Sequence, residues 1–130
     1  MTAIEITPTN HSPRIDFQPS GKLLIEGRAI PEDVNKLFAP LEEFISKLKL
    51  PEVVLDINMD YFNTATSKRL LEFLKIFDAN KNIEKPVVNW HYEFDDDDNK
   101  EMAEIYEDCL ERVSFNYIEH VELENLFEKR

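Results

Sequence analysis

The fold is decided by the stretch Asp60-Tyr61-Phe62-Asn63-Thr64-Ala65-Thr66-Ser67-Lys68, in the middle of the chain. Before it, residues 52–61 alternate apolar and polar side chains, as a strand with one buried face does. After it, apolar residues recur at helical spacing, namely Leu70, Leu71, Leu74 and Phe77. The stretch is therefore predicted to join a strand to a helix that runs from Thr64 to about Asn80.

A second alternating run, Pro86 to Phe94, follows this predicted helix. A strand, a helix and a strand of these lengths form a βαβ unit, whose right-handed crossover makes the two strands parallel. Strands covered by helices on both faces would be apolar throughout, whereas both of these strands alternate. We therefore expect the helices to lie mainly on one face of the sheet.

The N-terminal third is expected to complete the sheet. Residues 1–13 are rich in Thr, Pro and Asn and predict an extended arm that pairs at a sheet edge. Residues 14–17 and 22–27 predict a hairpin with Gly21 at positive φ. Pro31 is expected as the first helical residue of an apolar stripe that continues to about Leu50. Pro40 lies inside that stripe and predicts a kink or a break between two short helices.

The C-terminal third begins with the acidic run Asp95 to Asp98, expected to be a solvated loop that favours the start of the next helix. A last short strand is predicted over Phe115 to Val121, and residues 122–130 read as a charged tail that docks weakly on the body. The whole chain, 1–130, is thus predicted to be one α/β domain with a small mixed sheet of about four to five strands.

Composition narrows the class of partner. The chain has 27 acidic and 15 basic residues, a formal net charge of −12 and a sequence pI near 4.6. This charge repels nucleic-acid backbones and anionic lipid surfaces, so neither is an expected partner. The only cysteine, Cys109, cannot form an internal disulfide. With no apolar run near the roughly 18 residues of a membrane span and no secretion signal, a cytoplasmic location is expected.

The sequence contains no recognisable catalytic set. It lacks a Gly-rich phosphate loop, a nucleophile elbow and His/Cys metal spacing, so we expect no enzyme activity, cofactor or metal. One alternative remains open, a small-ligand or metal-binding site on the polar face of the two central strands. Its candidate residues are Asp56, Asn58, Asp60, Asn89, His91 and Glu93.

The strand-to-helix junction offers two further functions. A Thr64 hydroxyl that caps the helix would accept a hydrogen bond from an N–H two or three residues on. A phosphorylated Thr64 would instead face the free N–H groups of the helix start, with Lys68 and Arg69 as charge partners about one turn away. The acidity of the chain, and Asp60 nearby, oppose the added charge. From the residues alone, both functions stay open.

Three motifs in order resemble the SiaC family of bacterial regulatory phosphoproteins. These are Ile25-Glu26-Gly27-Arg28-Ala29-Ile30-Pro31-Glu32, the junction from Asp60 to Lys68, and Val88-Asn89-Trp90-His91-Tyr92-Glu93 followed by the acidic run. The resemblance covers the chain from about Thr7 to Ile118. It implies an architecture like that of STAS-domain anti-anti-sigma factors, with a phosphorylated hydroxyl at a helix N-terminus. The family's Tyr-x-Asn-Thr motif places that hydroxyl on Thr64, with Thr66 and Ser67 as lesser candidates.

The resemblance also implies a function and a set of partners. A cognate serine/threonine kinase would phosphorylate Thr64, and a metal-dependent protein phosphatase of the 2C type would remove the phosphate. The unphosphorylated form would bind an output protein such as a diguanylate cyclase, which links the family to cyclic di-GMP and biofilm formation. A plain interaction adaptor is the remaining alternative. The residues expected to form the switch surface around Thr64 are Asp60, Tyr61, Phe62, Asn63, Lys68 and Arg69.

Overall fold

The computed structural model describes residues 1–121, so the expected tail at 122–130 lies outside the described residues. Nine helices and strands follow one another within them. In chain order they are β1 (Ile4–Ile6), β2 (Arg14–Phe17), β3 (Lys22–Ala29), α1 (Val34–Lys47), β4 (Leu50–Phe62), α2 (Thr64–Ala79), β5 (Ile83–Glu93), α3 (Asp97–Asp108) and β6 (Ser114–His120).

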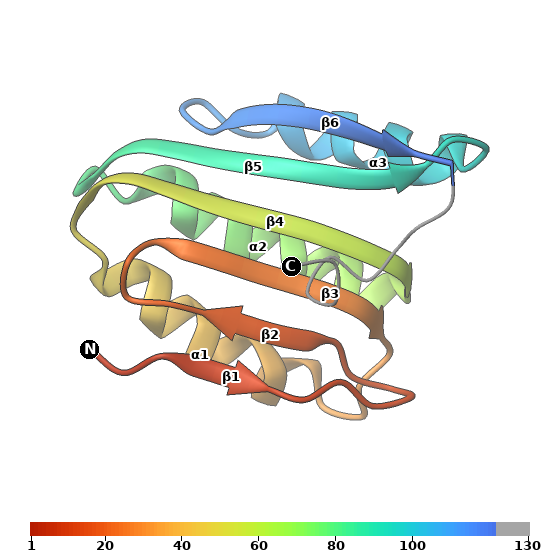
Figure 1. Cartoon of the computed structure of the whole chain (residues 1–130), viewed down its shortest axis with the longest axis horizontal. Coiled ribbons are helices and arrows are strands. Elements are labelled where there is room, and N and C mark those ends of the chain that lie inside the picture. The colour runs from red at the N-terminus through yellow and green to blue at the C-terminus, as the bar shows by residue number, and fades with distance from the viewer. Residues whose placement is uncertain (122–130) are drawn as a thin grey trace.

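The strands form one mixed sheet in the order β1-β2-β3-β4-β5-β6. The first two pairs are antiparallel, and the β3–β4, β4–β5 and β5–β6 pairs are parallel. The three helices lie together on one face (Figure 1). The expected mixed α/β fold, parallel βαβ unit and one-sided helices are confirmed. The sheet has six strands, one more than the expected four to five, because part of the N-terminal arm forms a strand of its own that pairs with β2.

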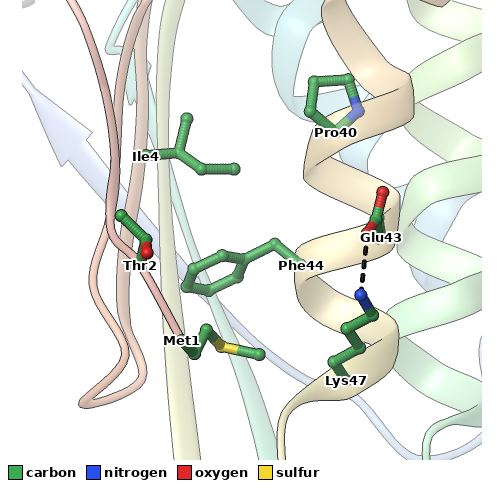
Figure 2. Close-up of a pocket in the computed structure, with 7 residues that line it drawn as sticks. All are labelled: Met1, Thr2, Ile4, Pro40, Glu43, Phe44 and Lys47. Carbon is green, nitrogen blue, oxygen red and sulfur yellow. Dashed lines mark hydrogen bonds and ion pairs between the residues drawn. The ribbon is translucent and has the colours of Figure 1, made fainter.

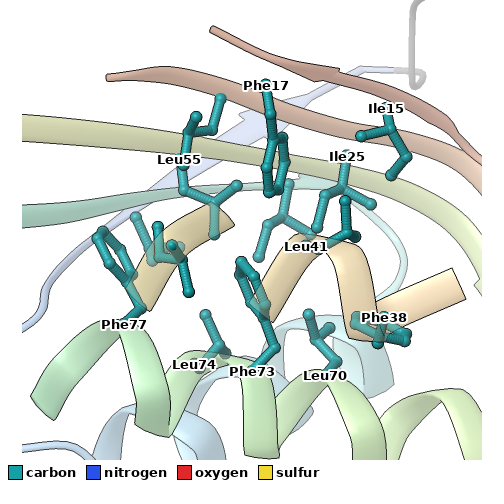
Figure 3. Packing of buried hydrophobic residues seen from close by; sticks show 14 of the residues in the cluster. Ile15, Phe17, Ile25, Phe38, Leu41, Leu55, Leu70, Phe73, Leu74 and Phe77 are labelled. Atoms are coloured by element: carbon teal, nitrogen blue, oxygen red, sulfur yellow. The ribbon is translucent and has the colours of Figure 1, made fainter. Parts of the chain in front are cut away.

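The core lies between the sheet and the helices. Phe73 from α2 packs near Phe17 from β2 and Phe38 from α1, with ring centroids 6.0 and 6.2 Å apart. Figure 3 shows the side chains of the two helices pointing up into the inward-facing residues of the strands. Alternation along β4 produces this arrangement, since Val53, Leu55, Ile57 and Met59 all face the helices and are buried. The buried face holds α2 in place beneath the central strands.

Helix α1 differs from its prediction at two prolines. Asp33 caps the helix by accepting a hydrogen bond from the Lys36 N–H at 3.1 Å, so the helix begins at Val34 and not at Pro31. Pro40 lies inside a helix that continues to Lys47, so the predicted break is wrong. The buried apolar face of α1, which includes Phe38 and Leu41 on either side of Pro40, outweighs the loss of one backbone hydrogen bond.

The hairpin between β2 and β3 has the predicted form. Gly21 adopts φ +93° and its N–H donates to the Gln18 carbonyl at 2.9 Å. A Cβ at this position would lie 2.9 Å from the carbonyl oxygen of Glu52, so only glycine fits both the backbone angle and the space.

Asp78 joins the end of α2 to the turn that leads into β6. Its carboxylate accepts backbone N–H bonds from Glu111, Arg112 and Val113, the shortest at 2.7 and 2.9 Å. Burial raises the pKa of Asp78, but the three N–H donors outweigh it and leave the pKa below its ordinary value. The ionised carboxylate therefore holds the last parallel strand to the helical layer.

We expect Asp78→Asn to reduce the free energy of unfolding at pH 7 by about 1–2 kcal/mol, because a neutral amide is a weaker acceptor for three N–H groups. The pKa is depressed in the folded state, so the contribution is present above the unfolded pKa of about 3.9 and is lost as pH falls through the folded pKa. Urea unfolding from pH 7 to pH 3 should show the two proteins converging. Glu84→Gln, which changes an exposed carboxylate nearby, is the control; an equal loss there would contradict the role of Asp78.

Candidate functional site at the start of helix α2

The strand-to-helix junction forms where predicted, with β4 ending at Phe62 and α2 beginning at Thr64. Asn63 is the N-cap, since its Oδ1 accepts a hydrogen bond from the Thr66 N–H at 2.9 Å. The possibility that Thr64 caps the helix is therefore wrong. Asn is at least as good an N-cap residue as Thr and comes one position earlier, which is the sequence signal for this assignment.

The three candidate hydroxyls have different environments. Thr66 is 0% exposed and its hydroxyl donates to the Ala29 carbonyl at the end of β3, at 2.9 Å. The Ser67 hydroxyl lies 2.6 Å from the hydroxyl of Tyr106 on α3, which in turn donates to the Ser67 carbonyl at 2.9 Å. Burial raises the pKa of Tyr106, and the hydrogen bond from Ser67 offsets part of that rise. Thr64, in contrast, is exposed.

The helix start is suited to an anion beside Thr64. The first intrahelical bond runs from the Ser67 N–H to the Asn63 carbonyl at 2.9 Å, so the N–H groups of Thr64 and Ala65 have no acceptor within the helix. Lys68 is exposed one turn further on. The helix dipole and these N–H groups favour negative charge at the same place.

Arg69 contacts α1 instead of the helix start. Its guanidinium forms a two-pronged ion pair with Glu42, with Nη2 3.1 Å from Oε1, and Nε donates to Asn35 at 2.9 Å. The side-chain hydrogen bond to Glu42 raises the pKa of Arg69 above its ordinary value. Of the two cations predicted near Thr64, Lys68 is the one at the surface.

The strand side of the junction combines an exposed and a packed aromatic ring. Tyr61 is 53% exposed, with the Arg28 guanidinium 5.5 Å from its ring centroid. Phe62 packs edge-on against Trp90, at 6.5 Å between centroids. Asp60 is exposed beside them. The junction thus presents Asp60, Tyr61 and Thr64 at the carboxyl ends of the parallel strands, where open α/β sheets commonly bind ligands and partners.

The polar sheet face holds a hydrogen-bonded chain that the strand register predicts. Asp56 Oδ1 lies 2.8 Å from His91 Nε2, and His91 Nδ1 lies 2.9 Å from His120 Nε2. An ionised carboxylate only accepts, so His91 Nε2 donates to Asp56. Asn58 makes a separate bond, donating to Glu26 at 3.0 Å. Asp60 stands at the strand end, and within residues 1–121 neither its side chain nor that of Glu93 bonds to these groups.

These polar groups form hydrogen bonds with one another and do not form a metal centre. Within the described part of the chain, no group of three or more His, Cys, Asp or Glu residues is arranged to hold a metal ion. His91 uses its two nitrogens toward opposite partners, so Asp56 and His120 do not converge on a common point. No helix in the same part of the chain is both long and apolar enough to span a membrane.

A cavity of about 350 Å³ lies between β1 and α1, away from the junction. Figure 2 shows Phe44 and Ile4 pointing into it from the two elements, with the Glu43–Lys47 ion pair of 2.8 Å along its helical side. None of the residues that line it belongs to the stretch around Thr64.

The described residues thus define a small, one-sided α/β sandwich of a mixed sheet and three helices that exposes Thr64 at the N-terminus of a packed helix. The chain belongs to the SiaC family of regulatory phosphoproteins, whose family model matches residues 6–120. No curated protein matches it.

Solved structures with the same fold come from Pseudomonas aeruginosa. SiaC of that organism is 22% identical and covers 92% of this chain and 100% of its own, with a TM-score of 0.75. SiaC in a crystal structure with the diguanylate cyclase SiaD, which it activates, is 24% identical and covers 90% of this chain and 99% of its own, with a TM-score of 0.79.

The cap assignment has a direct test in stability. We expect Asn63→Ala to lower the free energy of unfolding by about 1 kcal/mol, because the Thr66 N–H loses its acceptor. Thr64→Ala should change it by less than about 0.5 kcal/mol, since the exposed hydroxyl has no capping role. Asn63→Asp, which keeps an acceptor oxygen, is the matched control. Urea unfolding of the four proteins measures these differences, and a larger loss for Thr64→Ala than for Asn63→Ala would contradict the assignment.

Proposed function

We propose that the chain is a non-enzymatic, cytoplasmic partner-switching protein, acting as one domain over residues 1–130, whose state is set by reversible phosphorylation of Thr64. One observation carries the choice of residue: of the three hydroxyls at the start of α2, only that of Thr64 is exposed. Thr66 and Ser67 are held by hydrogen bonds to β3 and α3. A kinase reaching either of them would have to break part of the fold.

The local electrostatics support a phosphate at this position. A phosphothreonine carries a charge of about −1.5 to −2 at pH 7. At the helix start, that charge meets the N–H groups of Thr64 and Ala65 and the positive end of the helix dipole. Lys68, four residues on, lies on the same side of the helix and is exposed to serve as a counter-ion.

Family membership and the solved relative support our choice of partners. A cognate serine/threonine kinase adds the phosphate and a 2C-type phosphatase removes it, so the chain itself needs no catalytic set. The unphosphorylated form binds an output protein, for which a diguanylate cyclase is our choice. Support comes from SiaC of Pseudomonas aeruginosa, which was solved in complex with the cyclase SiaD that it activates.

The switch acts on the surface and leaves the fold in place. Asn63 remains the cap, and the buried or half-buried bonds of Thr66 and Ser67 stay in place. Phosphate is therefore added at the surface, where it faces solvent, the helix start and a docked partner. Burying a phosphate dianion against an apolar partner surface costs more free energy than the contacts there contribute, so phosphorylation releases the partner.

Phosphorylation by the cognate kinase is expected at Thr64. Intact-mass measurement after incubation with ATP and that kinase should show one added phosphate on the wild type and none on Thr64→Ala. Thr66→Val and Ser67→Ala serve as matched controls and should be modified normally, because their hydroxyls are not the target. Phosphate that persists on Thr64→Ala, or that disappears only in one of the controls, would overturn the choice of residue.

Phosphorylation should also separate binding from stability. The phosphorylated protein is expected to unfold at the same or a higher free energy, by up to about 1 kcal/mol, because a helix N-terminus favours negative charge. Its affinity for the cognate diguanylate cyclase should fall at least tenfold in isothermal titration calorimetry. Unphosphorylated Thr64→Ala is the control and should bind like the wild type. Equal binding of the phosphorylated and unmodified forms would favour a plain adaptor.

A further inference from the structure

The exposed apolar side chains are unevenly distributed over the described residues. Tyr61, Phe94 and Val121 are 53%, 55% and 83% exposed, and each stands at or just beyond the end of a parallel strand, β4, β5 or β6. These ends lie at one edge of the sheet, on the right in Figure 1. Thr64 follows β4 at the same edge. Apolar groups gathered at one edge indicate an interaction site, whereas single ones scattered over a surface do not.

The two aromatic residues occupy matching positions. Ile57 and Trp90 form the last register pair between β4 and β5, and Tyr61 and Phe94 each lie four residues beyond it. Asn99 links the two sides of the edge, since its Oδ1 accepts from Trp90 Nε1 at 2.6 Å and its Nδ2 donates to the Met59 carbonyl at 3.3 Å. The start of α3 is thereby fixed to both β4 and β5.

The backbone of Phe94 and the ring of Tyr61 are also held before any partner arrives. The Phe94 N–H donates to the His120 carbonyl at 2.8 Å, which ties its backbone to the end of β6. The guanidinium of Arg28 covers one face of Tyr61. Aromatic anchors that are already positioned lose little conformational entropy on binding, which favours their use as contact points.

The two sides of this edge differ in charge: the β5–α3 side is acidic, and the β4–α2 side carries both signs. Beyond Phe94, the chain exposes Asp95, Asp97 and Asp98 on the β5–α3 side. On the β4–α2 side, Arg28 and Lys68 are exposed with Asp60. A partner docked here meets an apolar centre with a carboxylate-rich border on one side only, so its complementary border carries Arg or Lys.

We propose that the surface formed by Tyr61 and Phe94 is the docking site for the diguanylate cyclase, which presents an apolar contact bordered by basic residues that face Asp95. This inference rests on the proposed function and adds the surface and its chemistry. Phosphate on Thr64 falls on the side away from those basic residues, three residues from Tyr61 and within the apolar contact. The phosphate is thus desolvated without gaining a counter-ion from the partner, which explains release.

Binding of the unphosphorylated full-length chain to its cognate diguanylate cyclase, measured by isothermal titration calorimetry, tests the surface. We expect Phe94→Ala and Tyr61→Ala each to weaken binding at least tenfold, as truncation of a central aromatic anchor does. Asp95→Lys should weaken binding too, and the wild-type affinity should fall as salt is raised. Ile105→Ala is the matched control, because Ile105 is 62% exposed but lies within α3. Circular dichroism melting confirms that each variant is folded.

The outcomes separate this inference from the proposed function. Suppose that the wild type binds the cyclase and that Thr64 phosphorylation releases it. If folded Phe94→Ala and Tyr61→Ala variants then bind as tightly as the wild type, the docking surface is wrong and the proposed function stands. Loss of binding in Ile105→Ala to the same extent also overturns it, since the effect would not be specific to this edge. A wild type that does not bind the cyclase overturns the proposed output partner, and the docking surface with it.

Discussion

The hydrogen bond from the Thr66 hydroxyl to the Ala29 carbonyl fixes the first turn of α2 to the end of β3. It joins residues 37 positions apart and is fully buried, so breaking it would leave a carbonyl without a partner at a cost of about 1–3 kcal/mol. The helix cannot slide along its axis while this bond holds. The position of Thr64, two residues earlier, therefore follows from the parallel pairing of β3 and β4.

Periodicity predicted the elements that surround the site. The change from alternation to helical spacing at Asn63 located both the end of β4 and the start of α2, because each pattern extends over more than two repeats. Alternation in β4 and β5 also predicted that helices cover one face, and it placed His91 beside Asp56. The two prolines predicted the course of α1 less well. The helix begins after Pro31 and continues through Pro40, because its apolar face packs against elements distant in the sequence.

The roles of the individual hydroxyls could not be predicted in the same way. Thr64, Thr66 and Ser67 have similar chemistry and adjacent positions, and what separates them are contacts to Ala29 and to Tyr106, 37 and 39 residues away. No local pattern records such pairs. The Asn63 cap, in contrast, can be predicted from the sequence, since Asn is a favoured N-cap residue. The exposure of Phe94 likewise depends on how β5 ends against β6.

In an acidic protein, the repulsion of an added phosphate has to be offset by groups close to the phosphate. The formal net charge of −12 acts over the whole surface, but at physiological ionic strength it is screened beyond about 8 Å. At the start of α2, the backbone N–H groups and Lys68, one turn on, favour negative charge against Asp60, whereas Arg69 is held by Glu42. The hydrogen bonds that hold this turn in place are made by Asn63, Thr66 and Ser67. Thr64 makes none of these bonds, so a modification there, as we propose, would alter what the surface binds and spare the stability of the fold.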